Sequence, residues 1–88
     1  MVTVKLDNGF EAHIEPDQLN DMYFIEALAD VENNIVKLSK VCSMLLGDEQ
    51  KLALYKTLED ENGKVPLQAV NDAISEIMTK AGEEVKNS

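Results

Sequence analysis

Apolar and polar side chains alternate along the first fourteen residues, on both sides of the turn sequence Asp7-Asn8-Gly9. This period-two pattern around Asn-Gly predicts a β-hairpin. A two-residue loop would pair Leu6 with Glu11 and mix the two faces, whereas a three-residue loop with a left-handed Gly9 pairs Leu6 with Phe10. The three-residue loop also pairs Val4 with Ala12 and Val2 with Ile14. Because an isolated hairpin is not stable in water, its apolar face must cover helices.

The rest of the chain has helical periodicity, interrupted at Asn33-Asn34, Gly47 and Gly63. We expect a turn from residue 15, followed by helices over about 22–32, 35–46, 48–62 and 66–85. The first of these helices is apolar around most of its circumference, so it is either central in the fold or gives one side to a partner.

The chain of 88 residues has room for a single domain and one modest hydrophobic core. The sequence therefore predicts a mainly α fold of the α+β class. In it, a hairpin over residues 1–15 precedes about four short helices, packed as a compact bundle over 16–85. Residues 86–88 are expected to form a charged tail.

The formal charge of −9 comes from 17 acidic residues and 8 basic residues. Nucleic-acid binding and anionic membrane surfaces normally require a basic face, so both are unexpected partners. The sequence shows no signal peptide and no apolar run long enough to span a bilayer. Together with the single cysteine, these features predict a soluble cytoplasmic protein.

The turn DENGKVP, residues 60–66, resembles part of an EF-hand calcium loop. If Gly63 were the sixth loop position, Leu58 would be the first and Ala69 the twelfth, although both positions require oxygen ligands. Pro66 would also fall inside the loop. We therefore interpret this stretch as a turn between helices, and we expect no metal and no cofactor.

Catalytic side chains are also not indicated. His13 is expected on the exposed face of the hairpin, and Cys42 lies within an apolar helical stripe, where cysteine acts as a small hydrophobe. The acidic residues around Asp60 form a charge run, which is typical of a solvated surface. The sequence thus favours a protein that is not an enzyme.

Apolar residues beyond the needs of one core are the candidates for partner binding. We expect Tyr23, Phe24, Val31, Val36 and Met44 to include this surface. For Phe24 and Val31, a core position under the hairpin and the last helix is the stronger interpretation, since small domains use nearly all their large apolar residues internally. Replacement of Met44 by Glu is expected to weaken partner binding with little change in melting temperature.

The order of the segments resembles a known family. A hairpin (VTVKLDNGFEA, 2–12) leads into DQLNDMYFIEALADVE (17–32), the helix junction LLGDEQ (45–50), the turn DENGKVP and a final amphipathic helix. This arrangement is similar to the small tail assembly chaperones of long-tailed phages and prophages of Gram-positive bacteria. The resemblance covers nearly the whole chain and has no single diagnostic motif.

The resemblance implies a non-enzymatic protein of the bacterial host cytoplasm that is not part of the mature virion. Such a chaperone binds and solubilises the tape measure protein and recruits tail-tube subunits. If a longer frameshifted form exists, this chain would be the short form. The oligomeric state stays open, and a homo-oligomer is compatible with the sequence.

The alternative function is a small acidic regulator, such as a nucleic-acid mimic that binds a basic partner. The net charge favours it, but the acids are scattered along the sequence at helix ends, turns and polar stripes. Binding of a mimic would collapse at high salt, whereas binding to an apolar helix would not.

Overall fold

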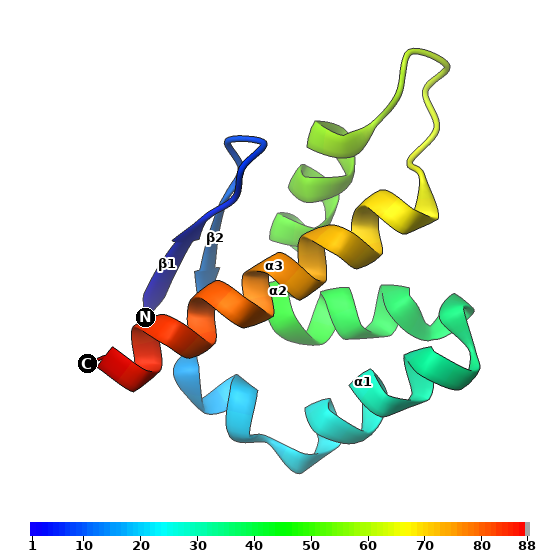
Figure 1. Ribbon diagram of the computed structural model, residues 1–88. Coiled ribbons are helices and arrows are strands. Elements are labelled where there is room, and N and C mark those ends of the chain that lie inside the picture. Colours follow the sequence, from blue (N-terminus) through cyan, green and yellow to red (C-terminus); the bar gives the residue numbers. More distant parts are fainter. Residues whose placement is uncertain (88) are drawn as a thin grey trace.

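The computed structural model describes residues 1–87, with side chains as far as Glu83 (Figure 1). Two parts of the sequence-based expectations, Ser88 of the tail and the side chain of Val85, lie outside the described residues. The elements follow in the order β1 (Val2–Lys5), β2 (Glu11–Ile14), the 3-10 helix η1 (Pro16–Asn20), α1 (Met22–Asn33), the 3-10 helix η2 (Ile35–Lys37), α2 (Leu38–Leu58) and α3 (Leu67–Asn87). The mainly helical fold with an N-terminal hairpin is confirmed.

The hairpin has the register expected from the apolar pattern. Val4 pairs with Ala12, and the two strands are antiparallel. The backbone N–H of Leu6 donates to the carbonyl of Phe10 at 2.8 Å, which closes the three-residue loop. Gly9 has a φ of 94°, so the loop uses the left-handed conformation that glycine adopts without strain.

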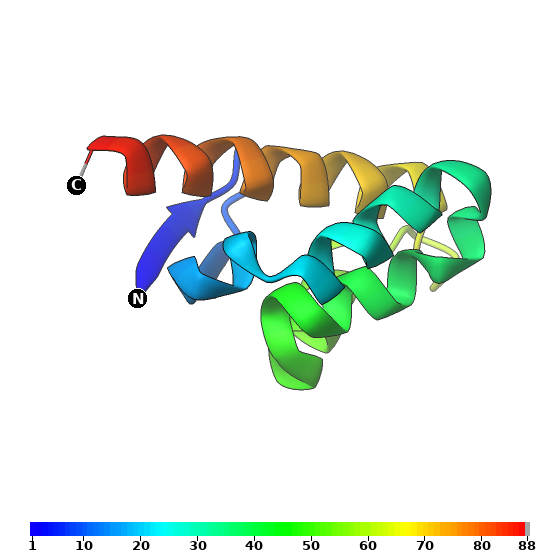
Figure 2. The ribbon, with the colours of Figure 1, turned by 90° about the horizontal axis from the view of Figure 1, so that it is seen from below.

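The apolar face of the hairpin forms one wall of the core. Its buried side chains are Val4, Leu6, Ala12 and Ile14. In Figure 1 the hairpin lies alongside α3, and contacts join β1 to α3 and β2 to α2. Figure 2 shows the helical part as two layers, with α3 running along one side and α1 and α2 beneath it. The helices thus supply the cover that an isolated hairpin lacks.

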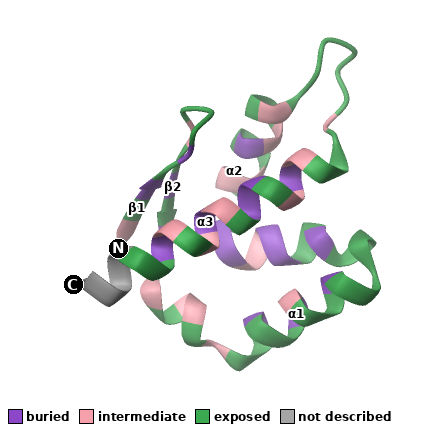
Figure 3. Ribbon diagram, viewed as in Figure 1, coloured by how far each residue is buried: buried purple, intermediate pink, exposed green. Residues whose placement is uncertain are grey.

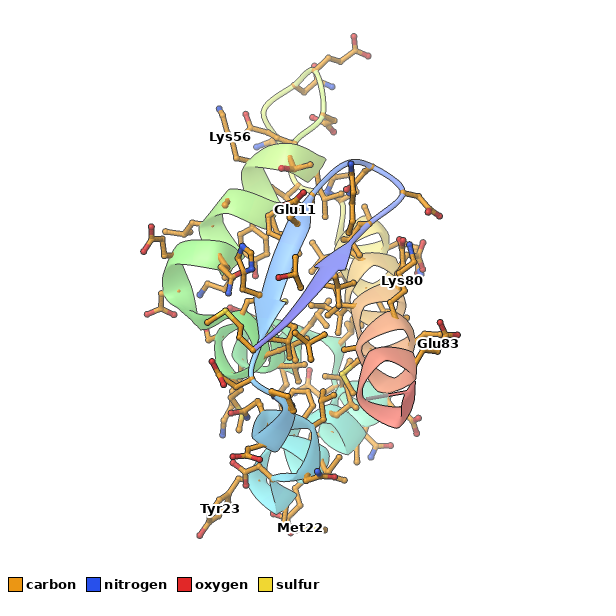
Figure 4. The ribbon with its side chains drawn as sticks, turned by 90° about the vertical axis from the view of Figure 1, so that its left-hand side faces the viewer. Glu11, Met22, Tyr23, Lys56, Lys80 and Glu83 are labelled. Atoms are coloured by element: carbon orange, nitrogen blue, oxygen red, sulfur yellow. The ribbon has the colours of Figure 1, made fainter. Side chains whose placement is uncertain are left out.

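Side chains from the helices occupy both outer edges of the hairpin. At the β2 edge, the Gln50 side chain accepts a hydrogen bond from the His13 N–H at 2.7 Å and donates to the His13 carbonyl at 3.0 Å. At the β1 edge, Lys80 donates to the Lys5 carbonyl at 3.0 Å, and in the adjoining loop Glu76 accepts from the Asp7 N–H at 2.9 Å. Figure 4 shows Lys80 beside the hairpin. These contacts replace the neighbouring strands that a larger sheet would provide.

Replacement of Gln50 by alanine is expected to lower the free energy of unfolding by about 1–2 kcal/mol, because its amide also donates to the Leu46 carbonyl at 2.7 Å. The control is Glu49→Ala, at an exposed neighbouring position, with an expected change below about 0.5 kcal/mol. Urea denaturation followed by circular dichroism measures both values. Equal losses in the two variants would show that the Gln50 contacts add no stability.

Helix α1 begins and ends within one residue of the expected range. Asp21 is the N-cap, since its side chain accepts from the Tyr23 N–H at 3.0 Å. Its buried residues are Phe24, Ala27 and Val31, which recur at helical spacing on one face. Helix α1 contacts mainly α2 and the two 3-10 helices, whereas the sequence favoured cover by the hairpin and the last helix.

The two helices expected over 35–46 and 48–62 both lie within α2, which the kink at Gly47 divides. The second of them ends at Leu58, four residues earlier than expected. Gly47 is non-helical, with φ 79° and ψ 161°, and it kinks the chain within α2. Only glycine adopts these angles without strain, so the sequence break was placed correctly. Residues 35–37 form η2 instead of the first turn of the expected helix. Leu52, expected on the apolar face of the third helix, is exposed.

The turn between α2 and α3 is held by the Asp60 side chain. Its carboxylate accepts from the backbone N–H groups of Asn62 at 2.9 Å and Lys64 at 3.0 Å. These bonds within the turn account for the Asp and Asn that resembled calcium ligands. Pro66 directly precedes α3. This helix extends to Asn87, two residues beyond the end expected from the sequence, so residues 86 and 87 of the expected tail are helical.

Candidate partner-binding groove

The five residues selected from the sequence do not form one surface. Phe24 is fully buried and Val31 is nearly so, which places both in the core and removes Phe24 from the accessible surface. Tyr23 is 77% exposed and Val36 is 79% exposed. Met44 is half-buried and packs against the core. The burial of Phe24 and Val31 agrees with the core interpretation that the sequence favoured for both, and the remaining three stay candidates at separate places in the fold.

Tyr23 lies at the start of α1 beside Met22, and Figure 4 shows both side chains projecting away from the body of the protein. The outward surface of α1 is exposed along most of its length (Figure 3). Helix α1 was expected to place Tyr23 together with Phe24, Ala27 and Val31. The structure separates them, because Phe24, Ala27 and Val31 are buried while Tyr23 remains in solvent.

Met44 lies on the hairpin side of α2, in a hollow with His13 and Gln50. Because Met44 already packs against the core, Met44→Glu is expected to lower the free energy of unfolding by about 1–3 kcal/mol. This reverses the expectation of an unchanged melting temperature. The control is Val36→Glu, at an exposed position, and thermal melts compare the two. If neither variant lowered the melting temperature, Met44 would again be a candidate for partner binding.

Val36 lies at a hollow of about 240 Å³ between η2 and the beginning of α3. Ile35 and Val36 line it on the η2 side, Val65, Leu67 and Val70 on the other, and Tyr55 also contributes. Leu67 is 52% exposed, although it is a large apolar residue. The hollow is therefore an apolar surface in contact with water, which none of the residues that the structure describes covers.

A second hollow of about 360 Å³ lies between α1 and α3. Leu28, Val31 and Glu32 of α1 line one side, and Asn71, Ile74 and Met78 of α3 line the other. Leu38 of α2 lines both hollows, so they adjoin one another. We call the two together the α1–α3 groove. Figure 1 shows α1 and α3 as separate arms, with the first half of α2 between them.

The α3 side of the groove was not identified from the sequence. Leu67, Asn71, Ile74 and Met78 follow one another at spacings of four, three and four residues, so they form one stripe along α3. The apolar members of this stripe were assigned to the core as a whole. The sequence pattern alone does not distinguish the α3 residues that a neighbouring helix covers from those that line the groove.

Tyr55 and Cys42 provide no reactive group at the groove. Burial raises the pKa of the Cys42 thiol above its ordinary value, and a hydrogen bond with Tyr55 only partly opposes this. Burial likewise raises the pKa of the Tyr55 hydroxyl, against a hydrogen bond with Ser39. A buried, protonated thiol is a poor nucleophile and a poor metal ligand. Among the described residues, no three His, Cys, Asp or Glu side chains are grouped as metal ligands.

Charge is unevenly distributed around the groove. Between Lys5 and Lys37 the chain has no lysine, and its acidic residues there are Asp7, Glu11, Glu15, Asp17, Asp21, Glu26, Asp30 and Glu32. Most of them belong to η1, α1 and the caps of these helices. One of them, Asp30, forms an ion pair with Lys37 at 3.5 Å, and both side chains are exposed. This part of the chain is therefore strongly acidic, and one of its acids, Glu32, lines the groove.

Within the described part of the chain, no helix combines the length and apolarity needed to cross a bilayer. Comparison of the chain with protein-family models, with curated proteins and with solved structures gave no significant match to any of them.

Proposed function

We propose that this protein is a tail assembly chaperone of a long-tailed phage or prophage, which binds an apolar helical segment of the tape measure protein in the α1–α3 groove. The observation that carries the proposal is the groove itself, an uncovered apolar surface on a chain with a net charge of −9. The resemblance of the ordered segments to that family supplies the identity of the partner.

An apolar groove in an acidic surface suits a protein that binds its partner temporarily. The apolar residues give the partner helix a place to bury its own apolar face. The excess of acidic groups keeps both the free protein and the complex soluble through charge repulsion. The proposed activity needs no catalysis, metal or cofactor.

The proposal places the protein in the host cytoplasm during assembly and outside the finished virion. It binds the tape measure protein first, and tail-tube subunits displace it as the tube grows along that protein. Recruitment of those subunits requires a second surface, for which the exposed Met22 and Tyr23 at the start of α1 are available.

The acidic, lysine-free stretch favours one alternative, an acidic regulator that binds a basic partner. Six of its acids lie between residues 15 and 32, so they are closer together than the sequence as a whole suggested. Such a complex would be held mainly by charge, and salt would screen it because the Debye length falls from about 10 Å at 0.1 M to about 3 Å at 1 M.

The test is co-expression of the tagged protein with the tape measure protein encoded beside its gene. We expect the tape measure protein to become soluble and to co-elute at both about 0.1 M and about 1 M salt, because apolar burial is not screened. A complex that forms only at low salt would support the acidic regulator. An insoluble, unbound tape measure protein would overturn the chaperone proposal.

A further inference from the structure

The shape of the groove specifies the pattern of side chains on its occupant, and this inference rests on the proposed function. We propose that the groove binds an amphipathic helix with two large apolar side chains seven residues apart and a basic residue beside the second of them. One apolar side chain enters the first hollow near Leu67, and the other enters the second hollow near Ile74. The basic residue faces Glu32.

The occupant is a helix because the groove has helical walls. The backbone groups of α1 and α3 are paired within their own helices, so they offer no row of free donors and acceptors to an extended strand. A strand in this position would bury unpaired backbone groups, whereas a helix satisfies its own. The stripe from Leu67 to Met78 is also a ridge of the kind that packs into the groove of another helix.

The spacing of the two anchors follows from the positions of the hollows along α3. The first hollow contacts α3 around residues 67–70, and the second contacts it around residues 71–78. Their midpoints are about six residues apart, which is about 9 Å along a helix. Residues seven apart on a partner helix are about 10.5 Å apart and on the same face, so this spacing fits a partner that runs along α3.

Charge determines which end of the partner enters which hollow. Among the described residues that line the two hollows, Glu32 is the only charged one, and it lies in the second. Glu32 is exposed, so its carboxylate is accessible to a partner. A lysine or arginine near the second anchor can pair with Glu32, whereas an acidic residue there would be repelled.

The test uses synthetic alanine-rich peptides of about 20 residues, which are long enough to be helical in water. The main peptide has leucines seven residues apart and a lysine one turn beyond the second. One control has leucines five residues apart, and the other has glutamate in place of the lysine. Binding to the full-length protein is measured by fluorescence anisotropy, and the contact surface is mapped by amide chemical shifts.

We expect the main peptide to bind at least ten-fold more tightly than the five-residue control, with shifts around Leu67 and Met78. Glutamate in place of the lysine should weaken binding, and Glu32→Gln should remove most of that difference, as a double-mutant cycle requires for a direct pair. Equal binding of the two leucine spacings, or shifts confined to Met22 and Tyr23, would overturn the inference.

Failure of this inference and failure of the proposed function give different results. If the tape measure protein is solubilised at high salt but both leucine spacings bind equally, the chaperone function stands and the anchor pattern is wrong. If the peptides bind as expected but the tape measure protein stays insoluble, the groove binds such helices and the assigned partner is wrong.

Discussion

Replacement of Phe24 by alanine is expected to lower the free energy of unfolding by about 3–5 kcal/mol, the usual range for a large aromatic side chain removed from a core. Phe24 is fully buried on the face of α1 that packs against α2. Domains of this size have a stability of about 5–15 kcal/mol, so the variant would lose a large part of it.

Tyr23→Ala is the matched control, because Tyr23 is the next residue in the same helix and is exposed. Its expected change is below about 0.5 kcal/mol. Urea denaturation at 25 °C, followed by circular dichroism, gives both values. A similar, small loss in the two variants would mean that Phe24 is not a core residue, and the packing of α1 on α2 described above would be wrong.

The second large effect is expected on binding. Leu67→Glu should weaken the complex with the tape measure protein at least ten-fold, because a charge would replace an apolar contact in the first hollow. Leu67 is about half exposed in the free protein, so the melting temperature should change little. Co-purification and a thermal melt of the same variant measure the two effects.

Leu52→Glu provides the control for added charge. Leu52 is 62% exposed, lies on α2, and lines neither hollow of the groove. We expect this variant to solubilise the tape measure protein as the wild type does. If Leu52→Glu reduced binding as much as Leu67→Glu, general charge repulsion would explain both, and the groove would lose its assigned role.

The hairpin was predictable in detail because its signal is local. Only one loop length places all the apolar residues of the two strands on one face, and a shift by one residue would reverse every side chain. The α1 boundaries were predictable for a similar reason, since Asp21 can cap its start and Asn33-Asn34 follows its apolar residues. The EF-hand interpretation was excluded by missing ligands at fixed positions.

The groove was not predictable, because it depends on how helices distant in sequence are arranged. Helix α1 is apolar almost all round, so its sequence does not tell which side faces α2. The sequence favoured core positions for Phe24 and Val31, which are buried, but its pattern did not separate them from Tyr23, which is exposed. Likewise, the α3 stripe is continuous in sequence, but only its position beside the gap between α1 and α3 makes Leu67 and Met78 accessible.

The side chains at the hairpin edges have a consequence for self-association. Uncovered strand edges allow copies of a protein to join through their backbones and grow into fibrils, above all when many copies are held close together. The side chains of Gln50, Glu76 and Lys80 form hydrogen bonds with backbone groups on both sides of the hairpin. Those backbone groups are therefore not free to pair with a strand of another copy. Under the proposed function, copies bound side by side along one tape measure protein would be at high local concentration, where this protection matters most.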